Sequence, residues 1–266
     1  MNPDLRLALE MADAADAITV PRFRSGDLVV QTKPDATPVS AADRAVEEEL
    51  RRLLALHRPG DGVLGEEYGE VPSGHRRWII DPIDGTANYV RGIPVWATLI
   101  ALEEAGEITL GVASAPLLGR RWWAARGAGA WGNAEPLRVS AVGSLADAQL
   151  SYGSLVTFEE CGLGPQGEAL GRPCRRTRGF GDFWMYMLVA EGGVDLAVDP
   201  IASLWDLAAP KVIVEEAGGR FTDFAGAARA DGHNAVASNG LIHDGALAVL
   251  ADPHPAVPPR RGPVVP

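Results

Sequence analysis

One short stretch constrains this chain more than any other, the segment 78–88, which reads WIIDPIDGTAN. Its apolar beginning predicts a buried β-strand, and two carboxylates, Asp81 and Asp84, close that strand. Gly85 and Thr86 follow, as in a turn that leads into a helix. Carboxylate oxygens suit a hard cation, and the N–H groups at a helix start suit a phosphate. The stretch therefore predicts a combined metal and phosphate site.

The composition is that of a globular enzyme and disfavours several other classes of protein. The chain has 266 residues, of which 47% are hydrophobic, enough for one large core or two smaller ones. A net charge of −11 disfavours a nucleic acid as the main partner, because that binding needs clustered lysine and arginine. We see no secretory signal and no membrane-spanning run, and so expect a cytoplasmic protein. Cys161 and Cys174 lack CxxC spacing, and the sequence leaves open whether they are free thiols or a disulfide.

The rhythm of apolar and turn-forming segments divides the chain into two halves and a tail. Residues 1–138 predict two helices and an antiparallel sheet, and residues 139–252 predict alternating strands and helices. The proline-rich residues 253–266 predict a disordered tail. In the first half, Ser40 and Asp43 form a capping-box pattern at the start of the second helix.

Individual elements follow from the same patterns. In the first half we expect a helix over 4–23, a proline-containing loop over 33–39, a polar loop over 69–77, and strands over 63–67, 95–102, 110–115 and 121–125. In the second half we expect helices over 182–191, 204–217 and 242–250, and strands over 195–198, 221–223 and 235–238.

Four acidic residues could converge on one site, because each closes or follows a compact apolar segment. They are Glu66, Asp81, Asp84 and Asp206. Three of them also have a simpler interpretation when taken alone. Glu66 with Glu67 could be a solvated surface pair, Asp81 a turn residue before proline, and Asp206 a first-turn acid that complements a helix dipole. The pairing of Asp81 with Asp84 before Gly-Thr favours the functional interpretation.

Several motifs together resemble the inositol monophosphatase family. They are GEE at 65–67, the stretch 78–88, WDLAA at 205–209 and EAGG at 216–219, in the order that the family has them. The resemblance extends from the first helix to about residue 250. It implies a layered αβαβα sandwich of the α+β or α/β class. It also implies a Mg²⁺-dependent, Li⁺-sensitive phosphomonoesterase that acts as a homodimer.

The resemblance also implies a set of metal ligands. Glu66, Asp81 and the backbone carbonyl of Ile83 would bind a first Mg²⁺. Asp81, Asp84 and Asp206 would bind a second, and a third, weaker ion would share Glu66. Mg²⁺ takes few carboxylates and keeps several waters, which suits such a sparse set of ligands.

Catalytic and phosphate-binding roles follow from the same resemblance. The backbone N–H groups of Gly85 and Thr86 would bind the phosphate, and the Thr86 hydroxyl with Asp43 would orient the attacking water. Glu67 would support the site, and Lys33 matches the basic residue of the family's mobile loop. That loop is one residue shorter here than in the inositol phosphatases.

Three further segments look like the histidinol-phosphatase branch of the family: KPDATPVS at 33–40, PVWA at 94–97 and RWWAARG at 121–127. That branch acts on L-histidinol phosphate, whose leaving group carries an amine and an imidazole.

The residues predicted to bind the substrate lie in the second half. Arg178 and Asp182 fall where the inositol phosphatases have small residues, and Asp199 replaces a glutamate that they use for sugar hydroxyls. Asp182 and Asp199 could bind the positive end of the substrate. The simpler interpretation of Asp182 is a helix N-cap, and nearby aromatic residues could be ordinary core.

Two other functions compete with a histidinol-phosphatase. An inositol-1-phosphatase or another small-ester phosphatase of the family would prefer polyols and be indifferent to Asp182. A non-catalytic member would act as a metal-binding or interaction protein and would have lost a ligand, whereas every candidate position is filled here.

Overall fold

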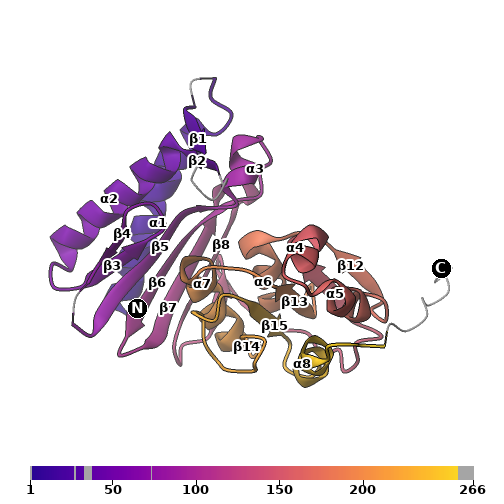
Figure 1. The fold of residues 1–266 in the computed structure, drawn as a ribbon. Helices are drawn as coiled ribbons and strands as arrows, with labels where there is room; N and C mark the ends of the chain where they lie inside the picture. The colour runs from indigo at the N-terminus through magenta and orange to yellow at the C-terminus, as the bar shows by residue number, and fades with distance from the viewer. Residues whose placement is uncertain (1, 27, 33–37, 73, 257–266) are drawn as a thin grey trace.

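The computed structural model describes residues 2–26, 28–32, 38–72 and 74–256, which form five layers (Figure 1). Two helices cover one face of an eight-stranded sheet, two lie between it and a five-stranded sheet, and three cover the outer face of the second sheet. The helices are α1 (Pro3–Arg22) and α2 (Ala41–His57) in the first layer, α6 (Asp182–Ala190) and α7 (Leu204–Glu216) in the middle, and α4 (Leu155–Glu160), α5 (Gly164–Gly171) and α8 (His243–Ala251) outside. The predicted αβαβα sandwich is confirmed.

The first sheet has the strand order β10-β9-β8-β7-β6-β5-β3-β4. Its strands are β3 (Gly62–Gly65), β4 (Gly69–Val71), β5 (Arg76–Asp84), β6 (Ala97–Glu104), β7 (Glu107–Ala115), β8 (Arg120–Ala125), β9 (Ala130–Gly132) and β10 (Glu135–Pro136). The expected antiparallel meander is present from β5 to β10.

Two expectations for this sheet were wrong. β3 and β5 pair in parallel, so the sheet is mixed rather than wholly antiparallel. The polar segment 69–77 is not a simple loop, because β4 and the start of β5 lie in it. The two errors have one cause: the chain leaves β3, runs back along it as β4, and thereby returns to begin β5 in the direction of β3.

A hairpin and a short helix stand at one end of the first sheet. β1 (Val30–Thr32) and β2 (Pro38–Ser40) pair antiparallel, and α3 (Thr86–Val90) follows β5 directly. The connection 33–37 lies outside the described residues, and with it Lys33. A 3₁₀ turn, η1 (Pro116–Leu118), joins β7 to β8.

The second sheet has the order β12-β11-β13-β15-β14 and mixes parallel and antiparallel pairs. Its strands are β11 (Gln149–Tyr152), β12 (Arg176–Arg178), β13 (Leu196–Asp199), β14 (Arg220–Thr222) and β15 (Ala235–Ser238). The predicted helices over 182–191, 204–217 and 242–250 correspond to α6, α7 and α8, whereas α4, α5, β11 and β12 had no specific prediction. Of the predicted tail over 253–266, residues 257–266 lie outside the described residues.

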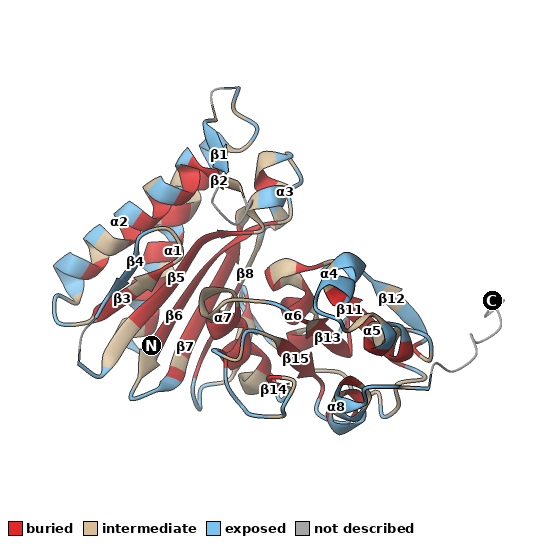
Figure 2. Ribbon diagram, in the orientation of Figure 1, coloured by how far each residue is buried: buried red, intermediate tan, exposed pale blue. Residues whose placement is uncertain are grey.

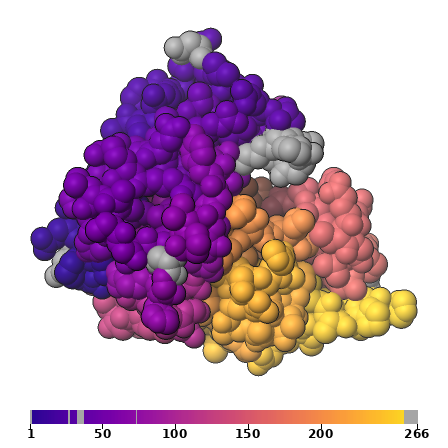
Figure 3. Space-filling view, turned by 60° about the vertical axis from the view of Figure 1, so that its left-hand side comes forward, coloured from indigo at the N-terminus to yellow at the C-terminus, as the bar shows by residue number. Residues whose placement is uncertain are grey.

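The core between the two sheets joins the two halves of the chain. One buried cluster contains Ile79 from the first sheet, Tyr186 from α6, Leu207 from α7 and Ala237 from the second sheet. Gly111 in β7 lets α7 approach closely, because a Cβ there would lie 2.8 Å from the Ala209 carbonyl oxygen. Both sheets are largely buried while the outer helix surfaces are exposed (Figure 2), and the two halves abut in the space-filling view (Figure 3). This packing anchors α7 firmly against the first sheet.

Both cysteines are free thiols, which answers the question that the sequence left open. Cys161 is exposed and Cys174 is buried, and burial raises the pKa of the Cys174 thiol to about 11. A thiol with this pKa is protonated and unreactive at neutral pH. No helix in the described part of the chain has both the length and the apolar character needed to cross a membrane.

Candidate metal centre

The end of β5 is irregular, and this irregularity turns two carboxylates toward one place. In a regular strand, residues three apart point to opposite faces. Between Asp81 and Asp84 the pairing of β5 with β6 shifts register. Pro82 lies in this segment and has no N–H for the ladder, while its carbonyl accepts a hydrogen bond of 2.7 Å from the Thr98 hydroxyl. The bulge re-aims the side chains at the strand end, as bulges beside functional sites commonly do.

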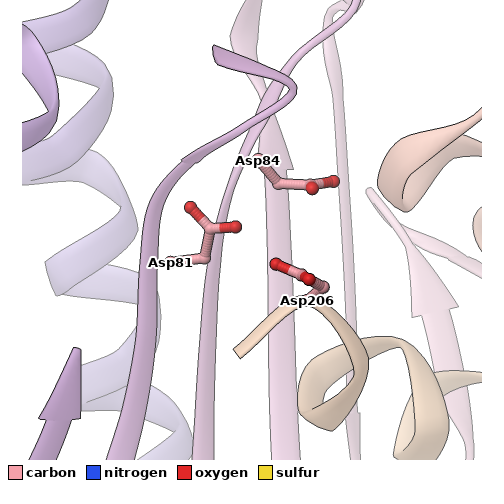
Figure 4. Close-up of side chains that lie close together, drawn as sticks. All are labelled: Asp81, Asp84 and Asp206. Atoms are coloured by element: carbon pink, nitrogen blue, oxygen red, sulfur yellow. The ribbon is translucent and has the colours of Figure 1, made fainter. Parts of the chain in front are cut away.

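A third carboxylate reaches the same place from the middle layer. Asp206 lies in the first turn of α7, and oxygen atoms of Asp81, Asp84 and Asp206 lie within 4.8 Å of one another (Figure 4). The Ser203 N–H donates to Asp206 Oδ2 at 2.7 Å, so Asp206 also caps its helix. The interpretation as a first-turn acid and the convergence on the cluster are therefore both true of this residue.

The charge of this cluster is unbalanced within the described protein. Burial, followed by repulsion from Glu66, raises the pKa of Asp81 well above its ordinary range. Burial and the Asp182 charge do the same for Asp84, and burial raises the pKa of Asp206 to about 7. Buried carboxylates that all repel one another are stabilised by a bound cation, and an all-oxygen donor set suits Mg²⁺ or Ca²⁺. The residues present thus fit a hard divalent cation.

Glu66 and Glu67 stand beside the cluster on the turn after β3. The Glu66 N–H donates to the Ile80 carbonyl at 3.2 Å, which ties the turn to β5 one residue before Asp81. The Glu66 carboxylate is not among the three that lie within 4.8 Å of one another, but its charge acts on both Asp81 and Asp206. The backbone N–H of Glu67 donates to the carboxylate of Glu47 at 2.7 Å.

Thr86 and Asp43 form a hydrogen-bonded pair next to the strand end. The Thr86 hydroxyl lies 3.1 Å from Asp43 Oδ1 and 2.9 Å from the carbonyl oxygen of Ile83. Asp43 Oδ2 accepts the Ser40 N–H at 2.8 Å, so the predicted capping box is present and holds this carboxylate in place. Burial raises the pKa of Asp43. Gly85 begins α3 with φ of +83°, a conformation that favours glycine.

Asp182 approaches the cluster from the first turn of α6. Its Oδ2 accepts a hydrogen bond of 3.1 Å from Asn88 Nδ2, and a Cβ on Gly85 would lie 3.2 Å from the same oxygen. The N-cap of α6 is Gly181, so Asp182 is not the helix cap that its sequence position suggested. Asp182 has φ of +48°, and burial raises the pKa of its side chain to about 6. The side chain is half-buried, and its backbone lies in the left-handed region that few residues other than glycine, asparagine and aspartate adopt.

The two other residues predicted to bind substrate lie differently. Asp199 closes β13, and burial raises the pKa of its carboxyl to about 7. It faces the buried hydroxyl of Tyr186 on α6, and its charge also acts on Asp206 through space. Arg178 is exposed at the end of β12, and its guanidinium donates to the neighbouring Thr177 carbonyl at 2.9 Å. Among the described residues, Arg178 forms no hydrogen bond or ion pair with these acids, so its role stays a prediction.

The sequence profile of the inositol monophosphatase family matches residues 2–253, which is nearly the whole chain. This protein belongs to the inositol monophosphatase family. Members of the family are generally metal-dependent, in agreement with the acidic cluster at the end of β5.

Relatives within the family cover this chain almost completely. A histidinol-phosphatase from Streptomyces coelicolor is 54% identical over 256 residues, 93% of this chain and 96% of that protein. One from Mycobacterium tuberculosis is 53% identical over 255 residues, 94% of this chain and 98% of that protein. The solved structure of extragenic suppressor protein suhB from Bartonella henselae matches with a TM-score of 0.87 at 32% identity, over 93% of this chain and 98% of that one.

Two residues near the site, Asn88 and Glu47, had no role predicted from the sequence. Asn88 stood in the quoted stretch, but only the fold brings it to Asp182, 94 positions later. Glu47 is fully buried although charged, and it lies one helical turn after Asp43 among apolar positions. The sequence signal that could have identified Glu47 is a glutamate on the apolar face of an amphipathic helix. The aromatic Phe183 is buried core beside Trp122, as the simpler interpretation held.

Proposed function

We propose that this protein is a Mg²⁺-dependent phosphatase that hydrolyses L-histidinol phosphate to L-histidinol and phosphate in histidine biosynthesis. The observation that carries the proposal is the convergence of Asp81, Asp84 and Asp206 in a chain 54% identical to a histidinol-phosphatase. Phosphate monoesters resist hydrolysis because their negative charge repels a nucleophile. A site that gathers divalent cations removes this obstacle.

Five residues would hold the metal. One Mg²⁺ would be bound by Asp81, Asp84 and Asp206. A second would be bound by Glu66, Asp81 and the backbone carbonyl of Ile83, and a third, weaker ion would share Glu66. When bound, Mg²⁺ would polarise the phosphoryl oxygens and make water acidic enough to act as a nucleophile near neutral pH.

The remaining catalytic roles are assigned to this chain's own side chains. The Thr86 hydroxyl would donate its hydrogen bond to Asp43, 3.1 Å away, and its oxygen would then accept a hydrogen bond from the attacking water. The N–H groups of Gly85 and Thr86 would bind phosphate oxygens. Glu67 would support the turn that carries Glu66, and Lys33 would add positive charge near the phosphate.

Asp182 and Asp199 would select the leaving group. Both carboxyl groups are half-buried beside the metal centre, and neither has an ion pair with an arginine or lysine within the described ranges. A buried carboxylate that lacks a protein cation is stabilised by a ligand cation. The ammonium and imidazole of histidinol supply such a charge, whereas a polyol does not. Arg178 is a further proposed contact at the rim.

Replacing Asp182 by asparagine is expected to raise KM for histidinol phosphate about tenfold, since a hydrogen bond to a charged group is worth roughly 1.5–3 kcal/mol. Asparagine keeps an oxygen for Asn88, so the local fold should persist. Steady-state kinetics on histidinol phosphate and on inositol 1-phosphate would measure the effect. A matched Asp199→Asn variant shows how much each of the two carboxylates contributes to KM for histidinol phosphate. Equal losses on both substrates would contradict a role in recognising the cationic group.

A substrate panel tests the proposed function itself. Phosphate release is measured with Mg²⁺ from histidinol phosphate, inositol 1-phosphate, fructose 1,6-bisphosphate and phosphoadenosine phosphate. We expect the highest kcat/KM on histidinol phosphate. A higher value on inositol 1-phosphate would replace the proposal by the polyol-phosphatase alternative, and no turnover of any ester by the folded protein would favour a non-catalytic member. The homodimer and Li⁺ inhibition remain predictions from the family.

A further inference from the structure

Glu47 is a charged side chain in a position where an apolar one would be expected. It lies on α2 between Val46 and Leu50, and its side chain is 0% exposed. A carboxylate removed from water is costly unless hydrogen bonds and an opposite charge compensate it. The groups that form hydrogen bonds and ion pairs with Glu47 therefore indicate its role.

All the described partners of Glu47 belong to two places, the turn after β3 and the next turn of its own helix. Glu47 Oε2 accepts the Glu67 N–H at 2.7 Å, and Oε1 accepts the Tyr68 N–H at 3.2 Å. Arg51 pairs with Glu47 at 2.7 Å, and its guanidinium also donates to the Gly69 carbonyl. Together the two side chains bind three consecutive backbone positions of the turn, which we call the Glu47–Arg51 clamp.

Gly65 makes this clamp sterically possible. It ends β3 directly before Glu66, and a Cβ at this position would lie 2.0 Å from Glu47 Oε1. Any side chain would thus displace the carboxylate from the turn. The Glu47–Arg51 clamp thus depends on the absence of a side chain at Gly65 as well as on the buried charge and the three backbone contacts.

We infer that Glu47, together with Arg51, is a positioning residue for the metal centre: the clamp fixes the turn 66–69 so that Glu66 stands beside Asp81 before any ion binds. On its other side the turn is held by the Glu66 N–H on the Ile80 carbonyl at 3.2 Å. The turn is therefore tied to both α2 and β5. The inference rests on the proposed metal-dependent function, because Glu66 is a proposed ligand. Residues that orient metal ligands without touching the ion typically change metal affinity about 10–100-fold when mutated.

Mg²⁺ binding without substrate is the direct test, measured by isothermal titration calorimetry. We expect the dissociation constant to rise about tenfold in Glu47→Gln, which keeps the shape but replaces one acceptor oxygen by a donor. Glu49→Gln is the matched control, since Glu49 lies on the same helix and pairs with Arg52 at the surface. The control should bind Mg²⁺ like the wild type. Circular dichroism and thermal melting establish that each variant is folded.

A second variant separates positioning from simple charge. Removing the positive charge in Arg51→Met should tighten Mg²⁺ binding if Arg51 acted only through electrostatics. Loss of the clamp predicts the opposite, weaker binding, and Arg51→Lys should restore part of it. Wild-type-like or tighter binding in a folded Arg51→Met variant would overturn the inference.

Hydrogen exchange on the wild-type protein covers the case in which the variants do not fold. The amides of Glu67 and Tyr68 should exchange slowly in EDTA, because the clamp holds them without metal. Fast exchange of these amides, or unchanged Mg²⁺ affinity in folded Glu47→Gln, would refute the clamp. Failure of the wild type to bind Mg²⁺ would instead refute the proposed function.

Discussion

An Asp84→Asn variant is expected to lose at least about 10³-fold in kcat/KM, which corresponds to about 4 kcal/mol of transition-state stabilisation. Asp84 lies in the three-carboxylate cluster, and a neutral amide both removes a ligand charge and presents a donor group to the ion. The same substitution should leave the metal-free protein as stable as the wild type, or more stable. Burial and the Asp182 charge raise the pKa of Asp84, which shows that its ionised form is unfavourable in the absence of metal.

The measurement combines Mg²⁺-dependent phosphate release with thermal melting in EDTA. Asparagine retains an oxygen that can accept the Phe183 N–H, so the junction of β5 with α6 keeps its hydrogen bond. Asp244→Asn is the matched control, because Asp244 is exposed on the outer helix α8 and pairs with Arg220. The control should retain activity. Parallel losses of activity and melting temperature in Asp84→Asn would mean that Asp84 is structural rather than a metal ligand.

Removal of metal should make the stability of the folded protein fall as pH rises above about 6.5. The pKa values of Asp199 and Asp206 are each raised to about 7 from an ordinary value of 3.8. A raised carboxyl pKa contributes stability that is complete below the ordinary pKa and is lost as pH rises through about 7. The whole loss between pH 3.8 and about 7 is at most about 4 kcal/mol for each group, at about 1.4 kcal/mol per pKa unit, and the part that remains above pH 6.5 is about 1 kcal/mol for each group. His243 acts in the opposite sense, because burial lowers its pKa to about 4, but its contribution is complete above its ordinary pKa of 6.5.

Urea unfolding in EDTA between pH 6.5 and 8.5 measures this dependence, and Mg²⁺ should abolish or reverse it. The ion replaces the protons that the carboxylates otherwise need, so its stabilising effect should grow with pH. Asp206→Asn should flatten the slope in EDTA. A free energy of unfolding that rises with pH in EDTA would contradict the assigned charge repulsion.

The local parts of this site were readable from the sequence because their determinants lie close together in the chain. The apolar run before Asp81 predicts the strand, Gly85 predicts the turn, and Ser40 with Asp43 predicts the capping box. Each depends on interactions over a few residues, where backbone propensity and side-chain capping decide the conformation. Their positions after compact apolar segments also made Glu66 and Asp206 candidates, and the family resemblance then assigned them to the metal ligands.

The long-range parts could not be read in this way. A parallel β3–β5 pair depends on where β4 turns back, and the contact of Asn88 with Asp182 spans 94 positions. Glu47 was passed over because a pattern of charged and apolar letters does not say which backbone groups a buried carboxylate will meet.

What the sequence by itself determined is therefore the chemistry: a strand ending in Asp81 and Asp84, a glycine turn after it, and the acids of a phosphatase family. The tertiary structure alone decided how these groups are arranged. The bulge in β5 turns two carboxylates to one side, and the packing of α7 on the first sheet brings Asp206 within 4.8 Å of them. The physical reason is that burial of apolar surface holds the layers together, and this packing places the carboxylates side by side although they repel one another. That repulsion remains for a cation to relieve.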